Sequence, residues 1–400
     1  LQYLVTVGEE DLWYDDRIFQ FEDVVASGRG KELAAADIES DDEPFAILYT
    51  PGTTGTPKGA VLTHANLVRT ATATSEALDL ASDIVLCTVP LYHIFGLSAA
   101  LLTAIVSGSA LVLQDRFDAS VAFDLVERHG ITVFHGVPTM FVMALRELDR
   151  NARNLPTLRT GIVAGAPVAE EVVRDVRERL VPEIEIAYGL TETSPTVSIT
   201  RPTDPPAKRF QTVGRPIEGV EVAVRDEDGE SLPPESVGEL AIRGFNVMKE
   251  YFRQPTQTSS VLSDEGFLQT GDLAMIDGEG YLHIVGRSSD VIIRGGYNVH
   301  PQEIEVLLRS HPAVADAAVF GIPNDVLGEL VCACVQPVEG ALITAKELRG
   351  YVYESLADYK VPDVIQFMDE FPDDTDERAR RLELARAVRV EEASGSGEPV

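Results

Sequence analysis

The chain carries the segment Tyr49-Thr50-Pro51-Gly52-Thr53-Thr54-Gly55-Thr56-Pro57-Lys58-Gly59. Its glycines let the backbone approach a ligand closely, its threonine hydroxyls and amides can donate hydrogen bonds, and Lys58 adds a positive point charge. The apolar run 45–49 before it reads as a buried strand, and 63–78 after it reads as a helix. The segment is therefore predicted to join a strand to a helix and to bind a polyphosphate through Thr50, Thr53, Thr54, Gly55 and Lys58.

The spacing of this segment is not that of a P-loop NTPase. In a P-loop, Gly-x-x-x-x-Gly-Lys is followed by Ser or Thr, whereas here Lys58 follows Pro57 and precedes Gly59. A kinase or GTPase is disfavoured, and an ordinary glycine-threonine surface turn is the alternative. The segment, with Thr63-His64 after it, resembles the phosphate loop of the adenylate-forming (AMP-binding) superfamily, although Pro51 stands where a serine is commoner.

The composition indicates a large acidic globular protein. Its 400 residues are 44% hydrophobic, which is enough for two or three domains. With 33 basic and 65 acidic side chains the formal charge is −32, so nucleic acid and anionic membranes are disfavoured partners. Only six basic residues are lysines, which resembles the proteins of salt-loving organisms; an acidic protein of a mesophile is the other reading.

The cysteines and the ends of the chain suggest a cytoplasmic protein. Cys87, Cys332 and Cys334 form no Cys-x-x-Cys pair, and an odd count argues against a disulfide framework. No apolar run of membrane-spanning length and no signal peptide are visible, so no integral membrane segment is expected. Since the chain lacks an initiator methionine, we expect a fragment or a trimmed protein. The oligomeric state is unknown.

The order of elements predicts an α/β fold class. Strand-like runs at 85–89, 110–113, 132–134, 160–163 and 185–188 alternate with amphipathic segments such as 121–129 and 170–180. Such alternation indicates a large layered domain with a mostly parallel sheet. After Pro216 short strands at 220–224 and 239–243 indicate a β-rich subdomain.

A second unit is expected from about Ser288. Strands at 291–294, 315–320, 330–336 and 364–368, with helices at 301–309 and 345–355, indicate a small mobile α+β C-terminal domain. The predicted division is 1–287 for a large nucleotide- and acyl-binding domain that is incomplete at its N-terminus, 288–390 for the small domain, and 391–400 for a disordered tail.

Two further motifs match the same superfamily in the same order. Gly165-Ala166-Pro167 resembles its adenine-side turn, and Tyr188-Gly189-Leu190-Thr191-Glu192-Thr193 resembles its signature for adenine and metal contact. Tyr188 offers a ring to stack on a purine, Thr191 a hydroxyl for the α-phosphate, and Glu192 a hard oxygen ligand for Mg²⁺. Taken alone, Tyr188 would read as a buried strand aromatic.

Later motifs extend the resemblance to ribose and to the domain junction. Thr270-Gly271-Asp272 matches the segment whose aspartate accepts hydrogen bonds from both ribose hydroxyls, and Gly286-Arg287 matches the segment whose arginine contacts ribose or phosphate. Each alone could be an ordinary turn aspartate or a surface arginine. Ser289 stands where the family places a hinge, before a glycine-containing loop at 294–298 that the family swings toward the active site.

The resemblance also implies an acyl pocket. His93, in the run 90–97, stands where a histidine or aromatic residue borders the family's acyl site, and His135-Gly136 begins a loop that lines the same region. A satisfied structural histidine is the competing interpretation for His93. The apolar residues at 140–143 would suit an acyl group or could be plain core.

Two departures from the family pattern stand out. The phosphate loop comes after only some forty residues, so the first subdomain is expected to be mostly missing. In the last motif, Glu377 and Arg378 replace the Gly-Lys whose lysine bridges carboxylate and phosphate during adenylation. Arg378 keeps the charge but is bulkier and planar, so adenylation is predicted to be impaired. The alternative is a degenerate or frame-altered end.

The resemblance implies an acid-thiol ligase, an AMP-forming acyl-CoA synthetase. It would use ATP, Mg²⁺ and coenzyme A to convert a fatty or aryl carboxylic acid into an acyl-adenylate and then an acyl-CoA. Lys58, Thr191, Glu192 and Arg378 would be the catalytic residues, with Glu192 holding the metal. Two alternatives are open: a truncated, catalytically weak nucleotide-binding homologue, and a peptide-synthetase adenylation module, although no carrier domain follows.

Overall fold

The computed structural model describes residues 4–7, 17–31, 40–50, 57–226, 228–324 and 326–371, together with Leu384 and Val388. The chain forms two compact units, Leu1–Glu43 and Pro44–Val400. In the first unit, strand β1 (Leu4–Thr6) pairs in parallel with β2 (Ile18–Gln20), and helix α1 (Phe21–Gly28) follows directly. None of the residues of α1 is buried.

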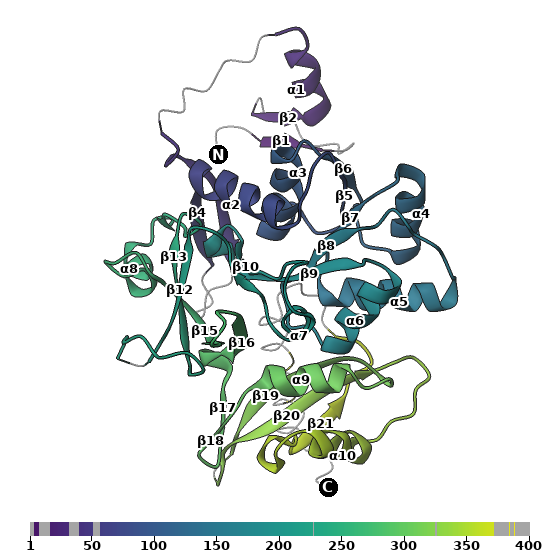
Figure 1. Cartoon of the computed structure of the whole chain (residues 1–400), viewed down its shortest axis with the longest axis vertical. Helices are drawn as coiled ribbons and strands as arrows, with labels where there is room; N and C mark the ends of the chain where they lie inside the picture. Colours follow the sequence, from purple (N-terminus) through teal and green to yellow (C-terminus); the bar gives the residue numbers. More distant parts are fainter. Residues whose placement is uncertain are drawn as a thin grey trace. The chain divides into compact units, whose positions relative to one another are not determined.

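A seven-stranded sheet forms the centre of the second unit (Figure 1). Its strands lie in the order β11-β10-β9-β8-β7-β5-β6, and the neighbours from β9 to β6 are parallel. Only β10 and β11 run antiparallel at one edge. The predicted α/β class with a mostly parallel sheet is therefore confirmed. The strands are β5 (Ile84–Cys87), β6 (Ala110–Leu113), β7 (Val133–Phe134), β8 (Thr160–Val163), β9 (Glu183–Gly189), β10 (Thr196–Ile199) and β11 (Arg215–Pro216).

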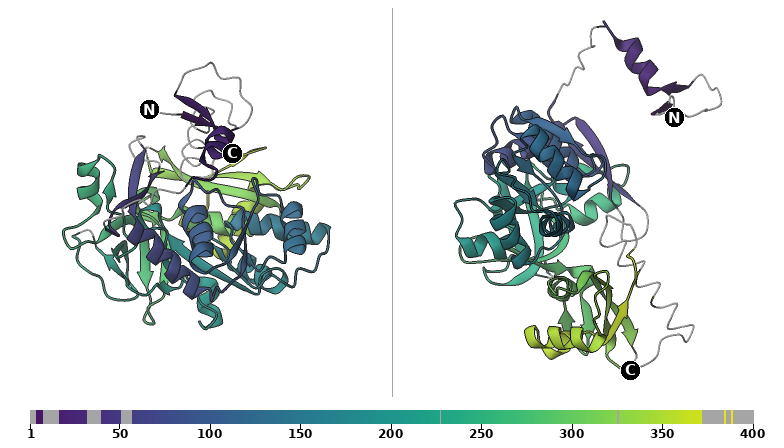
Figure 2. Two further views of the ribbon diagram at one scale, coloured as in Figure 1. Left: turned by 90° about the horizontal axis from the view of Figure 1, so that it is seen from above. Right: turned by 90° about the vertical axis from the view of Figure 1, so that its right-hand side faces the viewer.

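Helices cover both faces of this sheet because alternate strand residues point to opposite sides. Val133 belongs to the core formed with α2, the π-helix η1 and α3, whereas Phe134 belongs to the core formed with α4, α5 and α6. Figures 1 and 2 show these helices around the strands. They are α2 (His64–Ala77), η1 (Phe95–Leu102), α3 (Thr103–Val106), α4 (Ala119–His129), α5 (Pro138–Arg150) and α6 (Glu170–Arg179), with α7 (Pro206–Gln211) packing beside α6.

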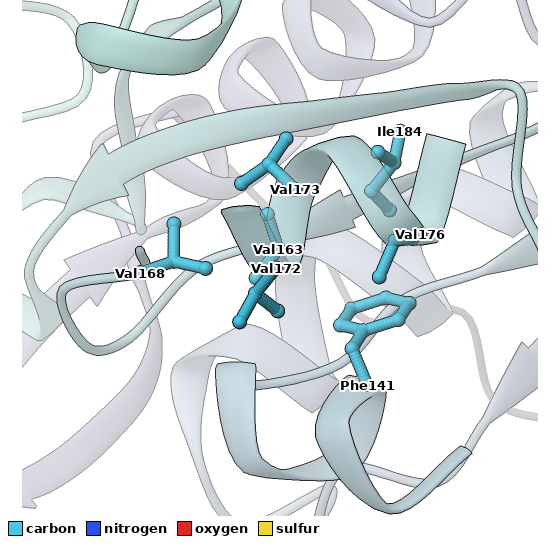
Figure 3. A pocket seen from close by; sticks show the side chains of 7 residues that line it. All are labelled: Phe141, Val163, Val168, Val172, Val173, Val176 and Ile184. Carbon is cyan, nitrogen blue, oxygen red and sulfur yellow. The ribbon is translucent and has the colours of Figure 1, made fainter. Parts of the chain in front are cut away.

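A small gap lies between α5, α6 and β8, on the face that carries Phe134. Figure 3 shows only apolar side chains around it. It has no polar group to orient a ligand, so it is part of the core rather than a binding site. Its lining residues are Phe141, Val163, Val168, Val172, Val173, Val176 and Ile184.

The segment predicted to bind phosphate joins the two strands of a hairpin. Strand β3 (Pro44–Thr50) pairs antiparallel with β4 (Lys58–Thr63), and β14 (Glu250–Tyr251) lies on the other side of β4. The prediction that the segment joins a strand to a helix is therefore wrong, because the apolar run of β4 intervenes before α2 begins. Helix α2 is capped by Thr63, whose hydroxyl accepts from the Asn66 amide while the Asn66 side chain accepts from the Thr63 amide.

The expectation that the strand before this segment is buried is also wrong. Phe45, Ile47 and Tyr49 are 41%, 37% and 64% exposed. They alternate along β3, which is an edge strand of the three-stranded sheet, so one face of this strand is uncovered.

The β-rich subdomain is present as a four-stranded antiparallel sheet in the order β12-β13-β15-β16. Its strands are β12 (Val220–Arg225), β13 (Val237–Gly244), β15 (Leu268–Ile276) and β16 (Leu282–Arg287), with α8 (Pro255–Val261) between β14 and β15. The register of β15 and β16 places Asp272 directly opposite Arg287. Two of the predicted ligand-binding residues are therefore cross-strand neighbours.

The C-terminal part is an α+β structure with its own core, as predicted from the pattern. Its sheet has the order β18-β17-β20-β19, with β21 pairing in parallel with β20. Its elements are η3 (Ser288–Asp290), β17 (Ile292–Arg294), β18 (Tyr297–Val299), α9 (Pro301–Arg309), β19 (Val314–Asn324), β20 (Gly328–Pro337), α10 (Ala345–Ser355), η4 (Asp358–Lys360) and β21 (Val364–Phe367). The predicted domain boundaries stay predictions, and the tail 391–400 lies outside the described residues.

No helix among the described residues is both long enough and apolar enough to span a lipid bilayer.

Candidate functional site

The first cluster of the site joins a strand of the large sheet to the β-rich subdomain. Tyr188, at the end of β9, donates a hydrogen bond of 2.5 Å from its hydroxyl to Oδ2 of Asp272. The other oxygen of Asp272 lies 2.9 Å from Nε of Arg287. Asp272 is 4% exposed, so the carboxylate is held in one orientation by two partners from different elements. Three predicted residues thus meet in one place.

The second cluster surrounds Glu192 in the 3₁₀ turn η2 (Thr191–Thr193). Oε1 of Glu192 accepts 2.7 Å from the hydroxyl of Tyr251 and 3.4 Å from that of Thr50. Nζ of Lys58 lies 5.1 Å from the centre of the Tyr251 ring, which is a cation–π contact. The hairpin end, η2 and β14 therefore converge on one carboxylate.

The two clusters influence each other electrostatically. Burial lowers the pKa of Arg287, but the carboxylates of Asp272, Asp290 and Glu192 outweigh it and hold that pKa above its usual value. Burial raises the pKa of Asp272, helped by Asp290 and Glu192, and Arg287 and the Tyr188 hydroxyl offset only part of that increase. The charge of the Glu192 carboxylate therefore reaches both members of the Asp272–Arg287 pair, so the two clusters lie near each other.

Both tyrosines remain hydrogen-bond donors at physiological pH. Burial raises the pKa of Tyr188 well above its usual value, and the Asp272 carboxylate adds to the effect. Burial and the Glu192 carboxylate likewise raise the pKa of Tyr251. Each phenol is therefore protonated and can hold its carboxylate partner in place.

Backbone turns shape the edge of the site. A Cβ at Gly189 would lie 1.7 Å from the carbonyl oxygen of Pro195, so only glycine fits where β9 meets the turn containing Thr191. Gly165 has φ +89° and begins the loop after β8, which continues through Ala166 and Pro167. In open α/β sheets, ligands bind beyond the carboxyl ends of the strands, and these loops lie at that edge.

The predicted acyl-pocket residues lie at the same edge of the large sheet. His135 and Gly136 follow β7; His135 is fully buried, and Gly136 bridges to Val163 of β8. His93 is exposed and precedes the π-helix η1, with its Nδ1 accepting from the Phe95 amide at 3.2 Å. The rings of Phe95 and His135 are 6.3 Å apart, so η1 links the His93 turn to His135.

Thr53, Thr54, Gly55 and Arg378 lie outside the described residues. Ser289 lies in η3 directly after β16, two residues beyond Arg287, and the hinge role remains a prediction.

The family models for AMP-binding enzymes match this chain. The model described as AMP-binding enzyme matches residues 3–252, and the model for the AMP-binding enzyme C-terminal domain matches residues 303–376. The chain belongs to the AMP-binding enzyme family. The predicted resemblance is therefore confirmed.

Relatives of this AMP-binding enzyme include named acyl-CoA synthetases. It is 39% identical to the putative acyl-CoA synthetase YngI of Bacillus subtilis over 83% of the chain and 61% of YngI, and 36% identical to a feruloyl-CoA synthase of Amycolatopsis over 85% and 70%. It resembles the o-succinylbenzoate-CoA synthetase MenE of Bacillus subtilis, solved with ATP and a magnesium ion, with a TM-score of 0.81 and 29% identity over 95% and 79% of the two chains. MenE has also been solved with its acyl-adenylate intermediate. The chain thus spans about three fifths of YngI.

The residues present fit a magnesium ion that is bound together with a polyphosphate. Within the described part of the chain, no group of three or more His, Cys, Asp or Glu side chains could hold a metal by itself. Magnesium is usually held by one or two carboxylates plus substrate phosphates, and a site with the single carboxylate of Glu192 beside Lys58 matches that arrangement.

Tyr251 is the site residue that sequence reasoning missed. It lies in the two-residue strand β14, pairs with Ala60 of β4, and is 5% exposed. Its hydroxyl orients Glu192 and its ring faces the Lys58 ammonium. A tyrosine in an irregular segment gives no periodic signal, so only the folded contacts identify it.

Tyr251→Phe should lower kcat/KM for ATP by about 10- to 100-fold, because it removes a hydrogen bond to a charged carboxylate, which contributes about 1.5–3 kcal/mol. The decrease in kcat/KM should be larger at limiting magnesium concentrations. Without the Tyr251 hydroxyl the Glu192 carboxylate is mobile, and a mobile carboxylate is a poorer magnesium ligand. The measurement is the rate of pyrophosphate release at several magnesium concentrations. Tyr281→Phe is the matched control: its buried hydroxyl donates to Asp204 at 2.9 Å without touching the site. If the rates of the two variants depend on magnesium in the same way, the Tyr251 hydroxyl does not orient Glu192 for metal binding.

Proposed function

We propose that this protein is an AMP-forming acyl-CoA synthetase. The carboxylate of an acid attacks the α-phosphate of ATP to give an acyl-adenylate and pyrophosphate, and the thiol of coenzyme A then displaces AMP. The observation that carries the proposal is the convergence of four residues from two sheets and a turn: Asp272 and Arg287 from the four-stranded sheet, Lys58 from the three-stranded sheet, and Glu192 from η2. The names of the relatives support the same reaction.

In this proposal each cluster holds a different part of ATP. Asp272 accepts the ribose hydroxyls, with Arg287 beside it, while Tyr188, Gly189 and the Gly165-Ala166-Pro167 turn border the adenine. Lys58, Thr50, Thr53, Thr54 and Gly55 contact the outer phosphates, and Thr191 contacts the α-phosphate. A magnesium ion on Glu192 supplies charge neutralisation for the leaving pyrophosphate. Catalysis is largely electrostatic, since preorganised donors stabilise charge as it develops.

The acid lies beside His93, His135 and Gly136, and the two half-reactions are exchanged by rotation of the small domain about Ser289. We place the division between the domains at Ser288, because the four-stranded sheet ends with Arg287 and a separate core begins at Ile292. The acid is a fatty or aryl acid, and the thiol acceptor is coenzyme A. We further propose that the protein works in the cytoplasm, where its three buried free cysteines stay reduced, and that its acidic surface suits high salt.

Hydroxylamine trapping tests the first half-reaction, because hydroxylamine converts an acyl-adenylate into a hydroxamate. We expect product with fatty or aryl acids and ATP, and formation of acyl-CoA when coenzyme A is added. Product with amino acids alone would indicate a peptide-synthetase module instead. ATP binding without any product would indicate the catalytically weak homologue.

The weak homologue is favoured by one observation, the pair Glu377-Arg378 in place of Gly-Lys. The double variant Glu377→Gly with Arg378→Lys should raise ATP–pyrophosphate exchange by at least about tenfold, because it restores the Gly-Lys pair that the family places beside the phosphates, with a compact point charge and no carboxylate. Arg381→Lys, in the same segment, is the control and should leave exchange unchanged. If ATP–pyrophosphate exchange does not increase in the double variant, the assignment of Glu377-Arg378 to the Gly-Lys position of the family is wrong.

A further inference from the structure

His135 presents a buried donor that its surroundings do not use. The residue follows β7, and its side chain is 0% exposed. Because Val133 faces η1 and Phe134 faces α5, the alternation along the strand points His135 toward η1. The ring distance of 6.3 Å to Phe95 agrees with that direction.

The hydrogen bonds of the ring fix its tautomer. The backbone N–H of Ile162 donates to Nδ1 of His135 at 3.1 Å, so Nδ1 is an acceptor and the proton of the neutral ring lies on Nε2. Nε2 is buried and has no hydrogen-bond partner within the described residues. Burial lowers the pKa of His135 to about 4, so the imidazole is neutral at physiological pH.

A neutral donor without an acceptor is costly in such a place. The core on this face, which includes Val89, Phe95 and Ala99, is apolar, and a leucine or methionine could fill the same volume without stranding an N–H group. Tyr188 packs on the same side of the sheet. The unsatisfied Nε2–H therefore lies on the face of the sheet that also carries Tyr188, the residue that we propose borders the adenine.

We propose that Nε2–H of His135 donates a hydrogen bond to an oxygen on the side chain of the bound acid. The substrate class is then carboxylic acids with a carbonyl, ether or hydroxyl oxygen away from the reacting carboxylate, in preference to unbranched saturated fatty acids. This inference rests on the proposed function and names the chemistry of its acid. His135 is in this view a specificity-determining residue.

The test compares saturated acids with analogues in which a carbonyl replaces one methylene at successive positions. Wild-type protein should prefer one oxo position, with kcat/KM for hydroxamate formation about tenfold above that of the parent acid and of the other oxo acids. Equal values at every position would overturn the inference, since a buried water would then satisfy the donor. The preference should be constant from pH 6 to 9, because a neutral ring donates throughout that range.

Two variants separate the donor from the fold. His135→Asn keeps an acceptor for the Ile162 amide but ends short of the Nε2 position, so the ratio of kcat/KM between each oxo acid and its parent acid should fall to about one. His135→Gln places an N–H near the Nε2 position and should retain part of the preference. If His135→Asn keeps the full preference for one oxo position, the inference is wrong. If that variant does not fold, the series of oxo acids with wild-type protein and with His135→Gln tests the inference instead.

The two proposals fail in different ways. If no acid forms an adenylate, the proposed function is wrong, and titration calorimetry with the same acids then reports whether the oxo analogue binds more tightly than its parent. If acids react without any preference for an oxo position, the synthetase proposal stands and the role of His135 is wrong.

Discussion

Lys58→Met should slow formation of the acyl-adenylate by about 10²- to 10³-fold, the range found when one preorganised electrostatic group is removed. Lys58 begins β4, directly after the glycine-rich segment, and its ammonium faces the Tyr251 ring whose hydroxyl holds Glu192. The residue is thus placed beside the proposed metal ligand, where negative charge grows as pyrophosphate leaves. Methionine keeps most of the length of the side chain but removes the charge and the N–H donors. Pyrophosphate release in a single turnover measures the effect.

Lys208→Met is the matched control for this variant. Nζ of Lys208 also lies 5.1 Å from a tyrosine ring, that of Tyr281, and it pairs with Asp277, away from the site. This variant should lose some stability and keep its rate of adenylation. The rate of adenylation of Lys58→Arg should lie between the rates of the wild type and Lys58→Met, because arginine keeps the charge but spreads it over a planar group. A Lys58→Met rate within threefold of wild type would remove Lys58 from the mechanism.

The ends of a helix could be predicted from the sequence where a proline or a capping residue marks them. The predicted helices 301–309 and 345–355 match α9 and α10, because Pro301 occupies the first turn of one and the Thr344–Glu347 capping box starts the other. The strands 110–113 and 160–163 also match β6 and β8. Apolar runs bounded by turn residues give such strands directly.

The sequence did not reveal features that depend on neighbours far along the chain. Strand β4 is a short apolar run between a turn and a helix, and it becomes a strand only by pairing with β3 and β14. The π-helix η1 is apolar on nearly every side, so no period of 3.6 residues marks it. Burial of β3 was predicted from its apolar residues, whereas its edge position leaves Phe45 and Tyr49 exposed.

Individual site residues followed from the family resemblance, but their partners did not. Tyr188 and Asp272 are 84 positions apart, and Glu192 and Tyr251 are 59 apart. A single sequence gives no distances between such positions. The resemblance therefore named Asp272 and Glu192, whereas only the folded chain shows that a tyrosine hydroxyl orients each carboxylate.

Asp272→Asn should weaken nucleotide binding by about 100-fold or more, because the proposed ribose contacts are two hydrogen bonds to a carboxylate, each contributing about 1.5–3 kcal/mol. Asparagine keeps the shape of the side chain but offers one acceptor oxygen in place of two. The protein should lose little stability, because burial raises the pKa of Asp272, so the fold does not favour the charged form of this side chain. Titration calorimetry with ATP and with AMP measures the loss, which should be similar for both because both carry the ribose.

Asp83→Asn is the control that separates the ribose role from the loss of a buried ion pair. Asp83 is 8% exposed, pairs with Arg159 at 2.6 Å and accepts from the Thr132 hydroxyl at 2.6 Å, so its surroundings parallel the arginine and hydroxyl partners of Asp272. It precedes β5 at the amino end of the parallel strands, whereas the site lies beyond their carboxyl ends. Its loss should lower the unfolding temperature and leave ATP affinity unchanged. If Asp83→Asn weakened ATP binding as much as Asp272→Asn, the effect at Asp272 would reflect the fold rather than the ribose.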